Sequence, residues 1–422
     1  MTLKSFNPVP WSKSTTIYEV NVRQYTVEGT FEAFSKHLPR LKDMGVGTLW
    51  FMPITPISVQ GRLGSLGSYY ACSDYTAINP EFGTIDDFRE LVAYAHSLGM
   101  KVIIDWVANH TGQDHIWTQT NPGFYKKNAE GAMYDSNGWN DVIDLNYYDG
   151  LMRKAMIDAM RFWVLECDID GFRCDMAHLV PLDFWRRARM ELSDVKDLFW
   201  LAETEDIHYL EVFDACYAWT WMHETEKLGK GQLSVSQLRN VLHNYQVSFP
   251  SNTTQLFFTS NHDENSWNGT EYEKYGPFAK PLAVISTLWN GIPLIYSGQE
   301  QPNHKRLKFF DKDRIEWGGQ PALHEFYKTL FQLHRDHPAL AFGNEVQWIP
   351  TNADEYVMAF VRRFEGREVL ALINLSPNHS FVQLKEGYVS GVYANVFTHE
   401  KVDVIPFQSF ELRAYESLIL VK

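Results

Sequence analysis

The sequence predicts an α/β fold, a (β/α)8 barrel with a short inserted subdomain after the third strand and a C-terminal antiparallel β-domain. Short apolar runs alternate with amphipathic helical stretches about eight times before residue 341, which is typical of a parallel barrel. The polar stretch over 111–146 is too long for an ordinary strand–helix loop. We therefore expect a barrel over residues 1–110 and 147–341, the insert over 111–146, and a β-sandwich domain over 342–422.

The predicted strands are short apolar runs bounded by turn residues. In chain order they cover residues 17–21, 46–51, 101–105, 169–173, 198–202, 211–217, 255–259 and 293–296. The clearest helical patterns cover residues 31–44, 85–98, 150–167 and 323–337. Gly45 and Gly99 follow the first two, where Gly favours the left-handed conformation that ends helices. After residue 341, the segments 356–363 and 368–374 are strand-like and show no helical period.

Composition excludes several classes of partner. The net charge is −14 and there is no basic cluster, so nucleic acid and anionic membrane surfaces are not expected partners. Aromatic residues make up 15% of the chain, an excess that suits flat platforms for sugars, although most will pack in the core. The four cysteines form no CxxC pair, which favours free thiols in a reducing compartment. The N-terminal residues lack an apolar stretch typical of a signal peptide, so we expect a cytoplasmic protein, although a leader already removed would leave the same pattern.

The run Gly-Phe-Arg-Cys-Asp at 171–175 is the most informative motif. Residues i and i+2 of a strand point to the same face, so Arg173 and Asp175 are expected in one pocket, while Cys174 faces the surrounding helices. A guanidinium keeps a neighbouring carboxylate ionised. An oriented carboxylate at the end of a barrel strand is a candidate nucleophile. The alternative is a structural ion pair.

Acidic residues follow four predicted strands at the end where barrels build their sites. The four runs are Asp-Trp-Val-Ala-Asn-His (105–110), Arg-Cys-Asp-Met-Ala-His (173–178), Trp-Leu-Ala-Glu-Thr-Glu (200–205) and Ser-Asn-His-Asp-Glu-Asn (260–265). One such acid could be a helix N-cap. Four at matching strand ends favour a shared site.

These runs resemble glycoside hydrolase family 13, the α-amylase family. Further matches are 67–84, Val-Ile-Asp-Leu-Asn at 142–146, and Gly-Ile-Pro-Leu-Ile-Tyr-Ser-Gly-Gln-Glu at 291–300. The matches follow the family's order over most of the first 340 residues. Each run is moderately specific, but seven in order make chance agreement implausible.

The resemblance implies a role for each residue of the site. Asp175 would be the nucleophile, Glu203 the general acid and then base, and Asp263 a third carboxylate that binds sugar hydroxyls and stabilises the transition state. The residues implied in substrate binding are Arg173, His110, His262, Tyr70, Asp105 and His178. A core role is the alternative for each histidine and for Tyr70. The chemistry requires no cofactor.

Glycoside cleavage needs one protonated and one ionised carboxyl. The apolar run before Glu203 should raise the pKa of that carboxyl by desolvation, and Arg173 should lower the pKa of Asp175. Because the resemblance implies retention of anomeric configuration, we expect the two carboxyls about 5–5.5 Å apart.

The chain departs from the family pattern just after Asp175. Many members carry Lys and His where this sequence has His178 and Leu179, so the preferred substrate length is open. Asn109 matches a calcium-ligand position, and Asp135, Asp141 and Asp144 offer further oxygens. Calcium needs about six to eight such ligands; the alternative for Asn109 is a structural hydrogen bond.

The resemblance favours a retaining hydrolase of α-1,4 links in starch or maltooligosaccharides. The enzymatic alternatives are a transglycosylase, a trehalose synthase or an α-glucosidase, which share the carboxylates. A catalytically inactive sugar-binding protein is a different class. That class predicts loss of a catalytic carboxylate, whereas all three are present.

Overall fold

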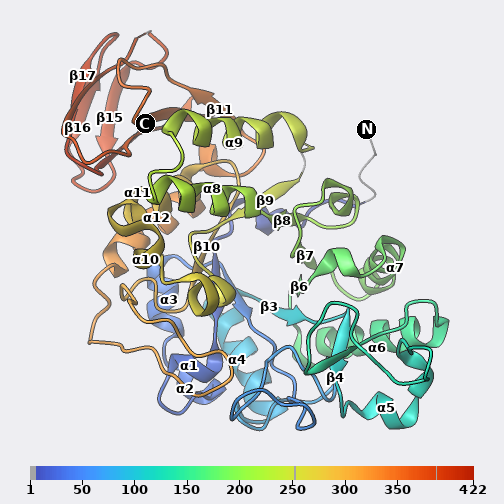
Figure 1. Cartoon of the computed structure of the whole chain (residues 1–422). Helices are drawn as coiled ribbons and strands as arrows, with labels where there is room; N and C mark the ends of the chain where they lie inside the picture. Colours follow the sequence, from blue (N-terminus) through green and yellow to red (C-terminus); the bar gives the residue numbers. More distant parts are fainter. Residues whose placement is uncertain (1–5, 251–252, 386) are drawn as a thin grey trace.

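A computed structural model describes residues 6–250, 253–385 and 387–422. Its centre is a closed barrel of eight parallel strands in the order β1-β10-β9-β8-β7-β6-β3-β2 (Figure 1). The strands are β1 (Ile17–Val20), β2 (Thr48–Phe51), β3 (Lys101–Trp106), β6 (Gly171–Cys174), β7 (Phe199–Ala202), β8 (Ala215–Tyr217), β9 (Thr254–Phe257) and β10 (Ile292–Tyr296). The predicted barrel is confirmed.

Helices outside the barrel cover its strands. They include α1 (Val22–Tyr25), α2 (Phe31–Ser35), α3 (Leu38–Met44), α4 (Ile85–Ser97), α6 (Gly150–Cys167), α7 (Leu182–Ser193), α8 (Trp219–Gly229), α9 (Val235–Ser248), α10 (Glu271–Tyr275), α11 (Ala279–Leu288) and α12 (His324–Asp336). The strands are therefore buried on both faces, which explains why they are apolar throughout. Trp50, Phe199 and Leu256 pack inside the barrel, while Phe172 and Cys174 pack in the outer layer.

The prediction of a single helix over residues 31–44 was wrong. The structure has α2 and α3 there, and α2 ends at Ser35. Pro39 lies in the first turn of α3. Proline lacks the N–H that a continuous helix would need and its ring clashes with the carbonyl four residues earlier, so it is tolerated only near a helix start. Gly45 ends α3 with a φ of 95°, as predicted.

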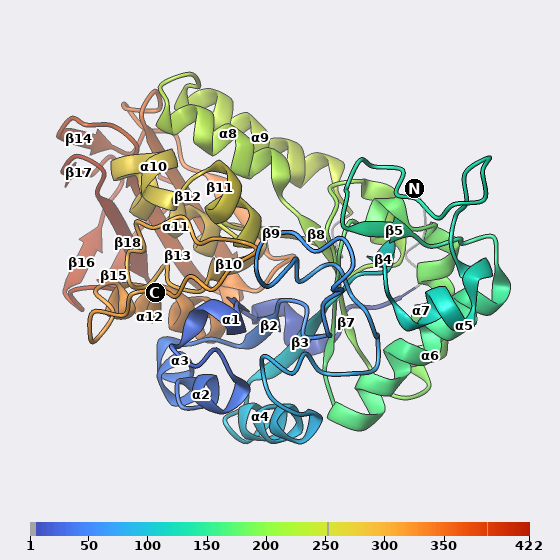
Figure 2. The same cartoon turned by 60° about the horizontal axis from the view of Figure 1, so that its bottom comes forward.

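The insert lies on one side of the barrel and the C-terminal domain on the other (Figures 1 and 2). In the insert, β4 (His110–Gly112) pairs antiparallel with β5 (Val142–Asp144), and α5 (Ile116–Thr120) lies between them in sequence. This pairing places Asp144 opposite His110. The insert is therefore attached directly to the carboxyl end of β3.

The C-terminal part is antiparallel, as predicted. Its main sheet has the order β11-β12-β13-β18-β15-β16, and β14 pairs with β17. The strands are β11 (Glu345–Trp348), β12 (Val357–Phe364), β13 (Arg367–Asn374), β14 (Ser380–Gln383), β15 (Gly391–Asn395), β16 (Lys401–Val404), β17 (Ser409–Leu412) and β18 (Ser417–Val421). Phe360 and Ile373 pack in one hydrophobic cluster with Trp221 and Leu282 of the barrel helices. Fully buried Arg362 reinforces this junction by donating to the carbonyls of Leu288 and Ala341.

All four cysteines are buried and free. Across the residues that the structure describes, no helix combines the length and apolar character needed to cross a bilayer. Residues 1–5, on which the expectation about a signal peptide partly rests, lie outside the described residues.

Candidate active site

The carboxyl ends of neighbouring strands bring the charged residues together. Register between β3 and β6 pairs Asp105 with Arg173. Asp175 and Glu203 come directly after β6 and β7. Because these strands are parallel and adjacent, their last residues converge on one end of the barrel.

Arg173 is the electrostatic centre of the group. It is fully buried, and its Nη1 donates to Asp105 at 2.8 Å and to Asp175 at 3.0 Å. Its Nη2 lies 2.8 Å from Glu203 Oε1, and its Nε donates to the Tyr217 hydroxyl at 3.0 Å. One guanidinium therefore orients three carboxylates, a geometry that the planar fork of arginine suits better than lysine.

A backbone N–H holds the Glu203 carboxylate as well. The Met176 N–H donates to Glu203 Oε2 at 2.7 Å. Met176 has a φ of 40°, a left-handed conformation that is costly for a residue with a side chain and is commonly found at functional sites. Both carboxyls are 6% exposed, so each is desolvated yet reaches the same cavity.

The prediction of a raised pKa for Glu203 is confirmed. The prediction of a lowered pKa for Asp175 was wrong. Burial raises the pKa of Glu203, although Arg173 opposes this. Burial and then the charge of Glu203 raise the pKa of Asp175 well above its ordinary value, and Arg173 only partly offsets them. Arg173 is shared among three carboxylates, so it does not hold Asp175 in a normally acidic state. The two carboxyls titrate as a pair.

A second network supports the site beside Asp105. The Tyr70 hydroxyl donates to Asp105 Oδ2 at 3.0 Å and lies 2.7 Å from His262 Nε2. His262 Nδ1 bonds Glu19 of β1, and His262 Nε2 lies 3.3 Å from Asp263. Burial lowers the pKa of His262, but Asp263 and Glu19 raise it well above its ordinary value.

Asp263 is the most open of the carboxylates, with a side chain 38% exposed. Desolvation raises its pKa, but the charge and hydrogen bond of His262 prevail and lower it below the ordinary value. Asp263 is therefore ionised more readily than either member of the Asp175–Glu203 pair, whose pKa values are raised.

Glu19 was not among the residues predicted from the sequence. It is fully buried, although it belongs to the apolar strand Ile-Tyr-Glu-Val. A carboxylate in a strand buried on both faces is the signal that would have found it, because such a group needs a charged or hydrogen-bonding partner.

These side chains surround a cavity of about 420 Å³. Its lining comes from the barrel, the insert and the loop after β10: Leu63, Ser68, Tyr70, His110, Gly138, Trp139, Asn140, Asp141, Val142, Asp175, Met176, Glu203, Asp263, Trp267, Phe309 and Phe310. Asp105, Arg173 and His262 support these residues from behind. Burial lowers the pKa of His110 to about 4, so its imidazole is neutral near pH 7.

His178 lies apart from this group. It is exposed on the short 3-10 turn Ala177–Leu179, outside the lining of the cavity. Its backbone carbonyl accepts a hydrogen bond from Tyr209. The structure thus brings together nine of the ten predicted site residues when Asn109, beside His110, is included.

The surroundings of Asn109 do not fit a calcium site. Its Nδ2 lies 3.3 Å from His110 Nδ1, and Asp144 is near it across the β4–β5 pair. The Asp144 side chain, however, is fully buried, and its Oδ2 is already paired with the Lys126 ammonium at 2.8 Å. Its Oδ1 has no hydrogen-bond partner among the described residues, so Asp144 offers one free carboxylate oxygen where calcium needs about six to eight ligands. Asp135 accepts backbone N–H groups within its own turn. An ammonium therefore supplies the positive charge that this carboxylate needs.

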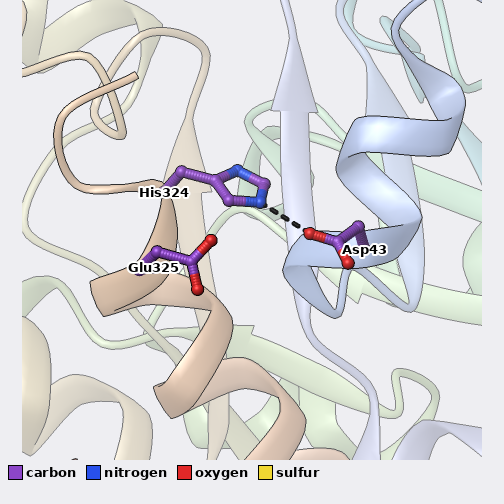
Figure 3. A group of neighbouring side chains, drawn as sticks. All are labelled: Asp43, His324 and Glu325. Atoms are coloured by element: carbon purple, nitrogen blue, oxygen red, sulfur yellow. Dashed lines mark hydrogen bonds and ion pairs between the residues drawn. The ribbon is translucent and has the colours of Figure 1, made fainter. Parts of the chain in front are cut away.

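A different group of metal-ligand types occurs away from the barrel mouth. Atoms of Asp43, His324 and Glu325 lie within 4.8 Å of one another (Figure 3). Asp43 Oδ2 bonds His324 Nε2 at 2.8 Å, and its Oδ1 accepts from Lys328 Nζ at 2.7 Å. With both oxygens occupied and a cation adjacent, this group is an ion-pair network between α3 and α12.

Comparisons with known proteins agree with this architecture. The family model for the α-amylase catalytic domain matches residues 12–130 and 124–356. The crystal structure of a noncanonic maltogenic α-amylase from Thermotoga neapolitana is 30% identical, with a TM-score of 0.90 over 97% of this chain and 99% of that chain. An α-amylase from Lactobacillus plantarum is 29% identical, with a TM-score of 0.89 over 98% of this chain and 99% of that one.

A curated α-amylase from Haloarcula japonica is 26% identical over 97% of this chain, which spans 64% of that relative's length. Other relatives are named cyclomaltodextrin glucanotransferase and cyclomaltodextrinase, so the named activities vary. The family match nevertheless extends over more than half of the chain. The chain therefore belongs to glycoside hydrolase family 13, the α-amylase family.

Proposed function

We propose that the protein is a retaining hydrolase that cleaves α-1,4 links of starch or maltooligosaccharides. The observation that carries this proposal is the pair of buried carboxyls, Asp175 and Glu203, each contacting one terminal nitrogen of Arg173 at the edge of one cavity. Two desolvated carboxyls that share a proton are the machinery of glycoside cleavage.

In the first step, protonated Glu203 gives its proton to the glycosidic oxygen while ionised Asp175 attacks the anomeric carbon. The C–O bond to the leaving sugar breaks, and a glycosyl ester with Asp175 forms. In the second step, Glu203 takes a proton from water, whose oxygen attacks the same carbon and releases Asp175. Two inversions give net retention.

The positions of the charges support this assignment of roles. Burial raises the pKa of both carboxyls, so the pair holds a proton to higher pH than two solvated carboxyls would. Arg173 and the Met176 N–H accommodate the negative charge that moves from Asp175 to Glu203 during the first step. Ionised Asp263, supported by His262, stabilises positive charge that develops on the sugar.

Tyr70 and His110 contact the sugar that is cleaved, and Asp105 and His262 support Tyr70 from behind. Tyr70 offers a ring at the cavity wall, and its hydroxyl is fixed by Asp105 and His262. Neutral His110 can donate or accept a hydrogen bond to a sugar hydroxyl. We also propose that the insert over 111–146 supplies one wall of this cleft and that residues 342–422 form a structural cap.

Asp175→Asn and Glu203→Gln test the proposal. Each removes one carboxylate with little change of volume, so each should abolish cleavage of maltoheptaose while the melting temperature stays within a few degrees of the wild type. Substantial residual turnover in either correctly folded variant would refute the corresponding role.

Product analysis separates hydrolysis from the transferase alternative. With maltoheptaose, the hydrolase proposal predicts shorter maltooligosaccharides whose new ends have the α configuration when observed at early times by NMR. Accumulation of oligosaccharides longer than the substrate would show that a sugar acceptor competes with water, as in a transglycosylase.

A further inference from the structure

A π-helical turn follows Asp263 directly. It covers Glu264–Asn268 and is closed by the Gly269 N–H, which donates to the Glu264 carbonyl at 2.9 Å. Such turns are rare and are frequently found at functional sites. The turn places Trp267 in the lining of the catalytic cavity. The Trp267 side chain is 52% exposed, which is unusual for so large an apolar residue.

Trp267 is part of an aromatic wall that it forms with Phe309 and Phe310. The ring centroids of Trp267 lie 5.3 Å from Phe309 and 5.6 Å from Phe310. Phe309 in turn stacks on Tyr70, with 6.2 Å between the centroids and 17° between the planes. The wall thus continues from Tyr70, at the reacting sugar, to the exposed face of Trp267.

We propose that Trp267, Phe309 and Phe310 form a platform that binds a second glucosyl unit, next to the one that is cleaved. The inference rests on the proposed α-glucan substrate. The apolar face of a glucosyl ring packs on an aromatic face, and an indole offers the largest such face. A wall that begins at Tyr70 and ends at an exposed Trp follows the path that a chain of linked sugars would take out of the cavity.

A buried ion pair sets the position of this platform. Glu264, the first residue of the π-turn, pairs with Lys274 of α10 at 2.6 Å, and their side chains are only 4% and 2% exposed. The second oxygen of Glu264 accepts from Asn268 at 2.9 Å. Both ends of the turn are therefore tied to one carboxylate, and Trp267 lies between them.

Hydrogen bonds tie the turn to the loop that carries the two phenylalanines. Asn265 Oδ1 accepts from the Leu307 N–H at 2.9 Å, and Asn265 Nδ2 donates to the Lys305 carbonyl at 3.2 Å. The Leu66 N–H donates to the Phe310 carbonyl at 2.9 Å. Trp267, Phe309 and Phe310 are thus held in one arrangement before substrate binds, which lowers the entropic cost of binding.

The test compares two substrates of different length. Maltoheptaose reaches the platform, whereas α-glucosyl fluoride occupies only the site of the reacting sugar. For Trp267→Ala we expect kcat/KM on maltoheptaose to fall at least about tenfold, mostly through KM, because stacking of this kind contributes on the order of one factor of ten. The same change removes the hydrogen bond from Trp267 to Asp263, so activity on α-glucosyl fluoride should fall as well. The platform predicts a further loss of about tenfold on maltoheptaose alone, part of which Trp267→Phe should recover.

Phe381→Ala is the matched control. Phe381 is 64% exposed on β14 of the C-terminal domain, so its removal should change neither activity. Unchanged kcat/KM on maltoheptaose in Trp267→Ala would overturn the platform. Trp267 also donates a hydrogen bond to Asp263, so an equal loss on both substrates would assign it to the catalytic carboxylate instead. Failure of the wild type to cleave either substrate would refute the proposed function itself.

The positioning role of the ion pair needs its own variant. Glu264→Gln with Lys274→Met removes both charges, so neither is left buried and unpaired. We expect KM for maltoheptaose to rise several-fold while kcat on α-glucosyl fluoride is retained. A lower melting temperature with an unchanged KM would show that the pair serves stability alone and would overturn the positioning role.

Discussion

Arg173→Met is the most informative single change in the site. The substitution removes three hydrogen bonds and an ion pair from a fully buried position. Without the guanidinium, Asp105, Asp175 and Glu203 are left buried without a cation in direct contact. Losing one partner of a buried pair costs roughly 3–5 kcal/mol of folding stability. A lower melting temperature is therefore expected, and activity must be measured well below it.

The effect on catalysis has a definite sign. Burial and Glu203 raise the pKa of Asp175, while Arg173 lowers it. Removing Arg173 leaves the raising effects unopposed, so the ionised form of Asp175 requires a higher pH. The acid limb of kcat/KM against pH should move upward by about 1 to 3 pH units. At its optimum, kcat/KM should also fall about 10- to 150-fold, as expected for losing one hydrogen bond to a charged group.

Arg173→Lys separates charge from geometry. Lysine keeps the positive charge but cannot contact two carboxyls with a planar fork. Its acid limb should therefore move less than that of Arg173→Met, although kcat/KM falls in both. The assay is kcat/KM from pH 4 to 9 on an aryl maltooligosaccharide. An acid limb that stays in place in Arg173→Met, or that moves to lower pH, would refute the electrostatic reasoning.

Two further predictions concern charges outside the catalytic pair. Because Lys126 neutralises Asp144, a chelator should change neither activity nor melting temperature. Lys126→Met, in contrast, should lower the melting temperature. A loss of activity in the presence of chelator that added calcium restores would contradict this prediction. Burial raises the pKa of Asp170, but bonds from His96 and the Val102 N–H outweigh it and lower that pKa below the ordinary value. Its stabilisation is therefore present above about pH 4, the ordinary value, and is lost as pH falls further. Asp170→Asn should lower the free energy of unfolding by about 3–5 kcal/mol at pH 7 and by less below pH 4. Asp158→Asn, which removes one partner of an exposed ion pair, is the control. An equal loss of stability at both pH values in Asp170→Asn would contradict the assignment.

The site could be predicted from the sequence because the strands of a parallel barrel all end on the same side, where their last residues lie close together. Asp105, Arg173 and Glu203 belong to consecutive positions around the barrel, so locating the ends of three strands was enough to place them together. The same reasoning located Asp263 after β9. The directions of two side chains were predicted as well, because neighbouring residues of a strand point to opposite faces. Arg173 points to the inside of the barrel and Cys174 to the outside.

Properties that depend on several partners were harder to predict. The pKa of Asp175 depends on how Arg173 divides its charge among three carboxylates, which the run 171–175 alone does not contain. Lys126 and Asp144 meet only because the insert folds back along β4. Trp267 was missed because its exposure depends on a π-helical turn, and a turn of that kind has no clear sequence pattern.

The central claim is that Asp175 attacks the sugar and carries it as an ester. Incubation with a 5-fluoro-α-glucosyl fluoride, whose glycosyl ester hydrolyses slowly, should leave one sugar on each protein chain. Peptide mass spectrometry should then locate this sugar on Asp175 in the wild type and find no adduct in Asp175→Asn. A sugar on Glu203 or Asp263, or hydrolysis with inversion and no adduct, would contradict the account.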